Sequence, residues 1–330
     1  MKTKAVVYPE ANKYCTTELT LDRPGPGDMV VKTLVSAISP GTERWILRGK
    51  HAGTRFPCVP GYHRIGVVEQ CGKAITDFEP GDVVYGCGNR WRDQRIVSMW
   101  GAHVGRSVSA PAGYRFLSSV KPNQFELDTL SLAILVGVAN RGIRALAPCP
   151  TEKLLIIGGG IIGVCAAQLA ALAGARPVLL EPDRQRAELV QTLGLPVVAP
   201  DASDLDAKLK ELAPASFDMV YDTVGHAPTT DAMVQRLRPQ GRLLLQAQYF
   251  DKEKCAIDLD QIKVREITIK TTIYIDARDF QETVEHIRAR RLRIAPLITH
   301  RLQAPRDLTR GYAMLDTGKP FNLGIVFRWN

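Results

Sequence analysis

The chain has 330 residues, of which 45% are hydrophobic and 23% are charged. At roughly 150 residues per domain this length predicts two domains, and the composition excludes disordered, collagen-like and coiled-coil proteins. Lysine and arginine number 43 against 34 acidic residues, giving a net charge of +9. The densest basic run, residues 286–293, is interpreted as a solvated helix face, with a nucleic-acid patch as the alternative. We expect no nucleic-acid partner and a mild attraction for small anions.

The cysteines and the N-terminus indicate where the protein is found. There are seven cysteines, an odd number without a Cys-x-x-Cys pair, which argues against a disulfide framework or a compact zinc knuckle. Reduced thiols and a cytoplasmic location are expected. The first residues hold no apolar core long enough for a signal peptide. The uncharged stretch 154–175 is interrupted by glycines, which favours a strand, a turn and a buried helix over a membrane span.

The first third of the chain has the pattern of a β domain. Strands are expected at residues 4–8, 29–35, 66–69 and 82–85. Glycine and proline pairs separate them, for example in the turn at 24–28. Short strands with this punctuation predict a barrel-like β domain.

From about residue 130 strands alternate with helices. Strands are expected at 154–157, 177–180, 217–222 and 242–246, the last after a turn at 239–241, and helices at 161–173 and 184–193. This alternation predicts a parallel sheet with helices on both faces. A helix at 279–291 and a strand at 322–327 end the chain.

A glycine motif follows the first of these parallel strands. It reads Gly158-Gly159-Gly160-Ile161-Ile162-Gly163 and opens the helix at 161–173. In the Gly-x-Gly-x-x-Gly pattern the first glycine permits a tight turn, the second lets the backbone approach a pyrophosphate, and the third lets helix and strand pack closely. The helix N-terminus then binds the phosphates. The motif therefore predicts a dinucleotide site; an ordinary strand–turn–helix is the alternative.

Glu181 ends the next strand, 18 residues after the last glycine of the motif. A carboxylate there accepts hydrogen bonds from a ribose diol and repels a 2′-phosphate, which favours NAD over NADP. Arg184 and Arg186 are close in sequence and would tolerate the phosphate, so NADP stays open. A solvated strand end is the other interpretation of Glu181.

Two later strand ends complete the predicted cofactor site. Thr223 and Val224 follow the third strand and are expected along the cofactor crevice. Gln246 and Ala247 follow the fourth, where the backbone would reach the nicotinamide amide. Plain strand-end loops are the alternative at both places.

With its domain order, the chain resembles the medium-chain dehydrogenase/reductase superfamily over essentially its whole length. The resemblance rests on Ser39-Pro40-Gly41-Thr42-Glu43, the segments 60–68 and 78–84, and the glycine motif. It implies an α/β protein made of a GroES-like β-barrel catalytic domain, residues 1–135 and 277–330, and a Rossmann domain with a doubly wound parallel sheet, residues 136–276. It also implies an active site in the cleft between the two, and a homodimer.

The departures from the family pattern concern zinc. Zinc-dependent members carry a cysteine ligand where this chain has Pro40, and a histidine ligand where it has Tyr62; a third ligand would fall near Gly137. The four-cysteine loop for a structural zinc is also missing. Three lost ligands leave no tetrahedral nitrogen and sulfur site, so no zinc is expected. An unusual metal site of His63 with Glu43 is the alternative. Within the family, the 39–44 segment and Tyr62 look most like the zinc-less branch with the bacteriochlorophyllide hydroxyethyl dehydrogenases.

Without zinc, side chains must stabilise the charge that develops on the substrate oxygen and deliver a proton. Tyr62 is the candidate by position, since the corresponding family ligand points at the substrate. His63 or Arg64 would supply a cation that lowers the pKa of Tyr62, and Glu43 would orient His63. The alternatives are core residues with satisfied polar groups. Thr42, in the same motif, and Arg64 are expected to bind substrate.

Three further residues are expected to bind substrate. Arg141 lies where the family places residues beside the nicotinamide, and it would bind a carboxylate or the cofactor phosphates; an internal ion pair is the alternative. Trp91 and His103 belong to a loop-like stretch, with Trp100, that would border the cleft and suit a bulky or anionic substrate. A solvated loop or a dimer contact is the alternative.

Three functions remain open on this sequence. The first is a zinc-independent, NAD(P)-dependent oxidoreductase that acts on a secondary alcohol or ketone of a small molecule. The second is a reductase of activated C=C bonds, like the quinone oxidoreductases. The third is a non-catalytic NAD(P)-binding sensor.

Overall fold

The computed structural model describes residues 1–249 and 256–329, so Cys255 lies outside the described residues. The chain divides into two compact units: Met1–Leu132 with Leu297–Asn330, and Ala133–Pro296. The second unit starts close to the expected residue 136 but ends at residue 296 instead of 276. The difference arises because the helix α9 (Ala277–Arg288) packs against α3 (Ala133–Leu146), a helix of the second unit.

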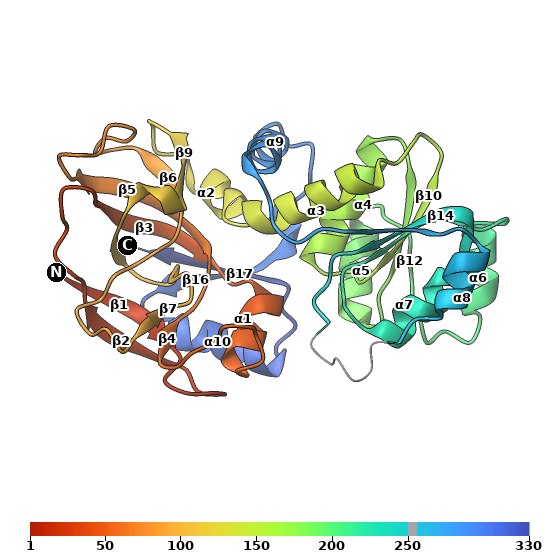
Figure 1. Cartoon of the computed structure of the whole chain (residues 1–330), viewed down its shortest axis with the longest axis horizontal. Coiled ribbons are helices and arrows are strands. Elements are labelled where there is room, and N and C mark those ends of the chain that lie inside the picture. The colour runs from red at the N-terminus through yellow and green to blue at the C-terminus, as the bar shows by residue number, and fades with distance from the viewer. Residues whose placement is uncertain (250–255, 330) are drawn as a thin grey trace. The chain divides into compact units, whose positions relative to one another are not determined.

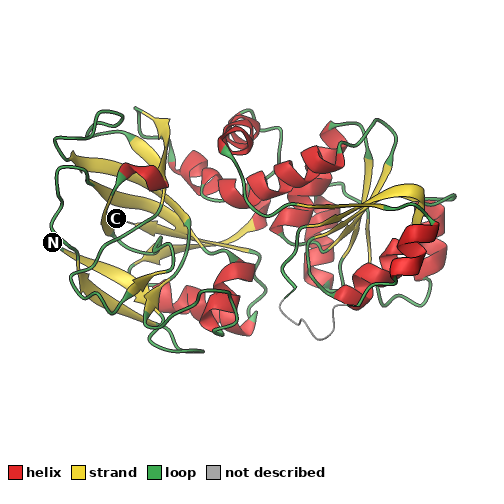
Figure 2. Ribbon diagram, in the orientation of Figure 1, coloured by secondary structure: helices red, strands yellow, loops and turns green. Residues whose placement is uncertain are grey.

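The first unit is built on a mainly antiparallel sheet (Figures 1 and 2). In the described part of the chain its order is β16-β17-β3-β5-β6-β9, and β8 pairs with β3. These strands are β3 (Met29–Ala37), β5 (His63–Cys71), β6 (Val83–Gly86), β8 (Arg106–Ser109), β9 (Tyr114–Ser118), β16 (Ile298–Ala304) and β17 (Gly324–Trp329). β1 (Lys2–Val7) pairs with β2 (Cys15–Thr20), and β4 (Cys58–Val59) with β7 (Val97–Ser98). The predicted β-rich first domain is confirmed.

Among the described residues, the α-helices of this unit are α1 (Pro40–Leu47), α2 (Gln124–Leu130) and α10 (Leu308–Thr317). α1 begins directly after Ser39, with a proline in its first turn, where the missing N–H and fixed φ of proline suit a helix start. Its buried residues Glu43, Ile46 and Leu47 recur at helical spacing. Ile46 and Leu47 join a hydrophobic cluster that includes residues of α10. The segment 39–43 is therefore the start of a helix anchored in the core.

The second unit holds a parallel six-stranded sheet, which confirms the predicted βαβ architecture (Figure 2). The strand order is β12-β11-β10-β13-β14-β15. The strands are β10 (Lys153–Ile157), β11 (Arg176–Leu180), β12 (Val197–Val198), β13 (Phe217–Asp222), β14 (Leu237–Leu245) and β15 (Thr268–Thr271). From β10 the chain adds β11 and β12 on one side of the sheet, and then β13, β14 and β15 on the other. The order of strands therefore reverses between β10 and β13, which is the switch point where ligands bind in such sheets.

Helices connect these strands, and they appear yellow to blue in Figure 1. Besides α3 and α9 they are α4 (Ile161–Leu172), α5 (Arg184–Thr192), α6 (Leu205–Leu212), α7 (Ala227–Val234) and α8 (Leu259–Val264). α4 is apolar on nearly every side and largely buried. Its packing against α3, β10 and β11 explains why the uncharged stretch 154–175 is a strand, a turn and a buried helix. No single helix among residues 1–249 and 256–329 is long and apolar enough to cross a membrane; α2 and α3 pass that test only as an interrupted pair.

One predicted turn is part of a strand instead. Residues 239–241 were expected to precede a strand at 242–246, but β14 runs from Leu237 to Leu245. Its pairing with β13 is irregular, because Phe217 pairs with Leu237 while Met219 pairs with Arg242. Gln240, at φ 60°, lies in the extra residues of this bulge, and its N–H donates to Arg265 O. Proline and glycine therefore mark a bulge here.

Candidate active site

Three hydroxyl groups meet at the start of α1. The hydroxyl of Tyr62, the residue before β5, lies 2.5 Å from Ser39 Oγ and 3.5 Å from Thr42 Oγ1. Ser39 is buried and is the N-cap residue of α1. Because hydroxyls both donate and accept, this hydroxyl cluster (Ser39, Thr42, Tyr62) can pass a hydrogen bond from one member to the next. The sequence analysis identified Thr42 and Tyr62 but missed Ser39; its place before a helix-starting proline was the available signal.

The surroundings of Tyr62 keep its phenol protonated. Burial raises the pKa of Tyr62, hydrogen bonds from Ser39 and Thr42 oppose this, and the charge of Glu43 raises it further. The prediction that a neighbouring cation lowers this pKa is therefore wrong. The ring also contacts Trp100 edge-on at 5.5 Å between centroids, and Trp100 is 37% exposed. Tyr62 is thus a protonated phenol next to a partly exposed aromatic side chain.

His63 does not supply a cation. Burial, and secondarily His103, lowers the pKa of His63 to about 3, so the imidazole is neutral near pH 7. Its Nδ1 lies 2.6 Å from the hydroxyl of Tyr85, which donates its proton to Ser131 O. Nδ1 must therefore carry the hydrogen. The His63 ring lies 4.4 Å from the Tyr62 ring between centroids, tilted by 48°. Its Nε2 has no hydrogen-bond partner among the described residues.

Glu43 was expected to orient His63, but the structure directs its carboxylate elsewhere. Its carboxylate is fully buried and accepts hydrogen bonds from Ser39 N at 2.8 Å, His103 Nε2 at 3.1 Å and the Tyr312 hydroxyl at 2.5 Å. His103 is also fully buried, so the expectation that it borders a cleft and binds substrate is wrong. The position of Glu43 on α1 explains why the expected contact with His63 is not formed. Glu43 lies on the buried face of the helix, with Ile46 and Leu47.

Two more predicted substrate residues lie in the core of the first unit. Arg64 is fully buried; its Nε donates to Gly86 O at 3.0 Å and its Nη2 to the Tyr114 hydroxyl at 2.5 Å. Trp91 is 3% exposed and packs in a cluster with Val7 and Leu21. Both expectations are corrected, because these side chains stabilise the β domain and reach no solvent.

Arg141 forms the internal ion pair that was the alternative interpretation. Its Nη1 lies 3.2 Å from Asp276 and 2.9 Å from Asp279. Asp279 is fully buried, caps α9 with Asp276 and also pairs with Arg144. A guanidinium committed to these carboxylates joins α3 to α9.

The residues at the zinc-ligand positions do not fit a tetrahedral zinc ion. Pro40 has no donor atom, Gly137 has no side chain, and the Tyr62 hydroxyl is bonded to Ser39. Structural and catalytic zinc sites use cysteine, histidine or carboxylate ligands. In the described ranges no group of three such side chains is placed to hold a metal ion.

The glycine motif forms the turn that a dinucleotide requires. Gly158 has φ +103°, and a Cβ on Gly163 would lie 1.9 Å from Gly158 O. A Cβ on Gly160, in contrast, would meet nothing within 4 Å. Gly160 precedes α4 and gives it no side-chain cap, so the first N–H groups of the helix, including those of Ile161 and Ile162, are available to an anion. The turn therefore leaves open space at Gly160, beside these N–H groups.

Glu181 faces this turn. One oxygen accepts from Gly159 N at 2.8 Å and the other from Asp183 N at 2.8 Å, and Arg186 Nη1 lies 3.2 Å away. The register explains this, because Ile157 pairs with Leu180 and the residues after both strands meet at the same sheet edge. Arg184 is turned outward and pairs with Glu188. The solvated-strand-end interpretation of Glu181 is wrong, since its side chain is 2% exposed.

The other predicted cofactor residues lie at the same edge of the sheet. A Cβ on Gly158 would meet Val224 at 2.5 Å and Thr223 at 2.8 Å. The N–H groups of Gln246 and Ala247 donate to Asp222 O. The Gln246 amide is bonded to Val138 O, Thr272 and Tyr221, so only the backbone carbonyls of this segment are left to receive a nicotinamide amide.

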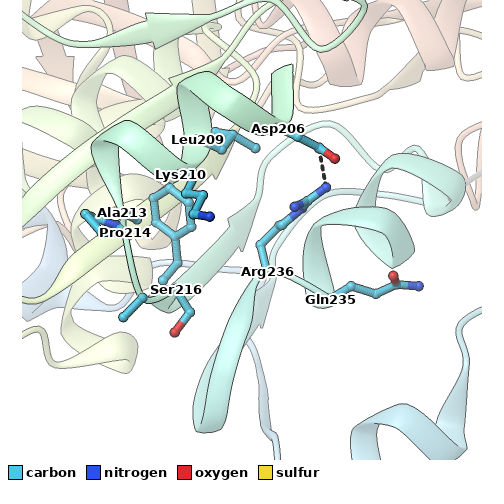
Figure 3. A pocket seen from close by; sticks show the side chains of 10 residues that line it. Asp206, Leu209, Lys210, Ala213, Pro214, Ser216, Gln235 and Arg236 are labelled. Atoms are coloured by element: carbon cyan, nitrogen blue, oxygen red, sulfur yellow. Dashed lines mark hydrogen bonds and ion pairs between the residues drawn. The ribbon is translucent and has the colours of Figure 1, made fainter. Parts of the chain in front are cut away.

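A separate pocket of about 400 Å³ opens on the second unit (Figure 3). It is lined by Lys210, Phe217 and Arg236 among others, and Arg236 is ion-paired with Asp206. Phe217 begins β13, so the pocket lies at the amino end of that strand, whereas the glycine turn follows the carboxyl end of parallel β10. None of the predicted site residues is among those that line it.

Comparisons with known proteins agree with these observations. Residues 25–117 match the family model of the alcohol dehydrogenase GroES-like domain, and residues 162–289 match that of zinc-binding dehydrogenases. A 2-desacetyl-2-hydroxyethyl bacteriochlorophyllide A dehydrogenase from Cereibacter sphaeroides is 29% identical over 91% of this chain and 90% of that protein. An L-threonine 3-dehydrogenase from Streptomyces coelicolor is 28% identical over 89% and 90%. A zinc-binding dehydrogenase structure from Sinorhizobium meliloti, bound to NADP, has a TM-score of 0.81 at 20% identity over 99% of both chains.

Proposed function

The chain belongs to the medium-chain dehydrogenase/reductase superfamily and is an oxidoreductase, and on this premise we propose that it interconverts a secondary alcohol and a ketone with NAD(H) and without zinc. The observation that carries the proposal is the hydroxyl cluster. Its Tyr62 hydroxyl, bonded to Ser39 at 2.5 Å, stands at a position that holds a zinc ligand in zinc-dependent members. A phenol there replaces a Lewis acid by a hydrogen-bond donor.

The nicotinamide ring, when bound, supplies or accepts the hydride. The chain's own residues then handle the oxygen and its proton. In ketone reduction the Tyr62 hydroxyl donates a hydrogen bond to the carbonyl oxygen and releases its proton to that oxygen as the C–H bond forms. Ser39, and more weakly Thr42, donate to the resulting phenolate and lower its energy. The proton returns from solvent after product leaves, and alcohol oxidation runs these steps in reverse.

The cofactor would be held by the second unit. The first N–H groups of α4 and the open space at Gly160 suit the pyrophosphate. Thr223 and Val224, in contact range of Gly158, would lie along it. The carbonyl oxygens of Gln246 and Ala247 would accept hydrogen bonds from the nicotinamide amide.

A bulky or anionic substrate is proposed on three grounds. Trp100 lies edge-on to Tyr62 and is 37% exposed, and His51 packs edge-on against Trp100 at 5.7 Å. This gives an apolar surface beside the reacting hydroxyl for a large, flat group. The Cereibacter relative is named for a bacteriochlorophyllide substrate. The net charge of +9 favours the approach of an anion.

The test of the proposed function is turnover under chelation. Purified, tag-free protein is assayed with NAD and a panel of secondary alcohols, in EDTA and after dialysis against it. We expect turnover to be unchanged within about twofold, because side chains replace the metal. Elemental analysis of the same sample is the control. Loss of turnover that added Zn²⁺ restores would refute the zinc-free mechanism, and a saturated C–C bond with an intact carbonyl would identify a C=C reductase instead.

NAD preference is expected to depend on Glu181. In Glu181→Ser the ratio of kcat/KM for NAD to that for NADP should fall at least tenfold, because the carboxylate that repels a 2′-phosphate is gone and Arg186 loses its partner. Asp218→Ser is the matched control, since this acid also lies on the second unit but at the other end of its sheet, where it pairs with Arg238. An unchanged ratio would mean that Glu181 only supports the glycine turn.

We also propose a cytoplasmic homodimer. β15 is the last strand of the six-stranded sheet and leaves an edge unpaired within the described chain. Ile269, Ile273 and Tyr274, in and after β15, are 40%, 60% and 74% exposed. An exposed strand edge with apolar side chains favours pairing with a second copy, and sedimentation would then give twice the 36.3 kDa chain mass.

A further inference from the structure

The buried carboxylate of Glu43 lies at the centre of a hydrogen-bond network. It accepts from a backbone N–H, an imidazole N–H and a phenol O–H, contributed by Ser39, His103 and Tyr312. All four residues are 0–2% exposed. A carboxylate away from water is stable only when its lone pairs are satisfied. These three bonds meet that condition and also connect α1, the 100–104 segment and α10.

A chain of hydrogen bonds leads from the C-terminal strand to Glu43. Trp329 Nε1 can only donate, and it donates to Ser36 Oγ at 2.9 Å. Ser36 Oγ lies 3.0 Å from His103 Nδ1, and His103 Nε2 lies 3.1 Å from Glu43. The ring of His103 is therefore held on both sides, by Ser36 and by Glu43.

Two arms run from Glu43 to the hydroxyl cluster. In the first, Glu43 holds the N–H of Ser39, whose Oγ is bonded to Tyr62. In the second, Glu43 holds the ring of His103 against Gly61. A Cβ on Gly61 would lie 2.4 Å from that ring, and Gly61 has φ +92°. Gly61 is the residue before Tyr62, so both the hydroxyl partner and the backbone of Tyr62 are fixed by one carboxylate.

We propose that Glu43 is a positioning residue for the reaction: held by His103 and Tyr312, it fixes Ser39 and the Gly61–Tyr62 backbone so that the Tyr62 hydroxyl is presented to the substrate oxygen. The proposal rests on the proposed function for the reaction it serves. The geometry is sufficient for this proposal, because moving a hydrogen-bond donor by about 1 Å can lower the rate of catalysis about 100-fold.

The negative charge of Glu43 also favours the protonated form of Tyr62. Among the described residues, Glu43 acts on Tyr62 through its charge and His63 through a ring contact at 4.4 Å. His63 is neutral, whereas the charge of Glu43 raises the pKa of Tyr62. Removing the charge should therefore lower that pKa. Ketone reduction requires the protonated phenol. As the pH rises, a Glu43 variant without the charge should therefore lose activity at a lower pH than the unchanged protein does.

The test compares three single variants in ketone reduction. Glu43→Gln keeps the size and removes the charge, and Tyr312→Phe keeps the charge and removes one donor. Tyr114→Phe is the matched control, since Tyr114 is a buried tyrosine of the same unit whose hydroxyl is bonded to Arg64 and Ser107 and makes no bond to Glu43. We expect kcat to fall about tenfold in the first two and less than twofold in the control. The Kd for NADH should be unchanged in all three.

Two readouts separate positioning from loss of folding. In Glu43→Gln the alkaline limb of kcat should move to lower pH, which a merely destabilised protein would not show. In a Tyr62→Phe background, Glu43→Gln should change kcat less than twofold, because the group it positions is gone. Equal losses with and without the Tyr62 hydroxyl, or losses that match Tyr114→Phe, would overturn the proposal. Unchanged kcat in Tyr62→Phe alone would instead overturn the proposed chemistry.

Discussion

Tyr62→Phe is expected to lower kcat for ketone reduction about 100-fold or more, with little change in the Kd of the cofactor. Removing one donor that stabilises a developing oxyanion costs about 100- to 1000-fold in other enzymes, and proton delivery adds to this. The variant keeps the ring that packs on His63 and Trp100. Steady-state kinetics with NADH and a ketone substrate, beside cofactor titration by fluorescence, measure the two quantities.

The control for this variant is a phenol removed elsewhere in the same unit. Tyr114→Phe loses a buried hydroxyl that is bonded to Arg64 and Ser107, so it reports the cost of such a loss to stability. If Tyr62→Phe keeps full turnover while Tyr114→Phe is also active, the phenol has no part in the chemistry. A neighbouring hydroxyl such as Thr42 or a bound metal would then have to stabilise the oxygen.

Gly160→Val is expected to weaken NAD(H) binding about 100-fold without unfolding the protein. Gly160 has φ −71° and ψ 179°, an extended conformation that valine adopts, and a Cβ there would meet nothing within 4 Å. The new side chain would fill the space that the pyrophosphate needs. Each lost charge-assisted hydrogen bond costs about 1.5–3 kcal/mol, so one or two of them account for about 100-fold in Kd. Calorimetric titration with NADH measures it.

A second glycine makes the control. Gly27 also has open space around its Cβ position and lies in a turn of the first unit, so Gly27→Val should leave the Kd for NADH and the Tm unchanged. Gly163→Ala would be uninformative about binding, because its Cβ would collide with Gly158 O and disrupt the turn itself. Undiminished NADH binding by Gly160→Val would show that the pyrophosphate lies elsewhere.

Local patterns were sufficient for the second unit. The strand at 153–157, the glycine turn and the helix at 161–172 follow each other within 20 residues, and each has its own signal. The carboxyl end of the next parallel strand must lie beside that turn, so strand order alone brings Glu181 to the glycine motif, where it accepts from Gly159 N. The bulge in β14 was missed because proline and glycine mark turns and bulges alike.

Local patterns were insufficient for the first unit. Glu43, His63, Arg64, Trp91 and His103 are polar or amphipathic residues in a motif-rich region, which suggested a solvent-lined site. The structure buries every one of them. Their partners, such as Tyr312 for Glu43 and Tyr85 for His63, lie far away in sequence, at separations of 269 and 22 residues. Nothing in the sequence near Glu43 indicates Tyr312.

The sequence by itself therefore determined the order of the two domains, the parallel sheet and the glycine turn, because each depends on contacts between residues close in the chain or on residue identity alone. Only the tertiary structure decided which polar side chains reach the substrate and which are buried. That depends on hydrogen bonds between distant segments: Ser39 with Tyr62, and Glu43 with His103 and Tyr312. Protonation states follow from burial, which a linear sequence does not contain.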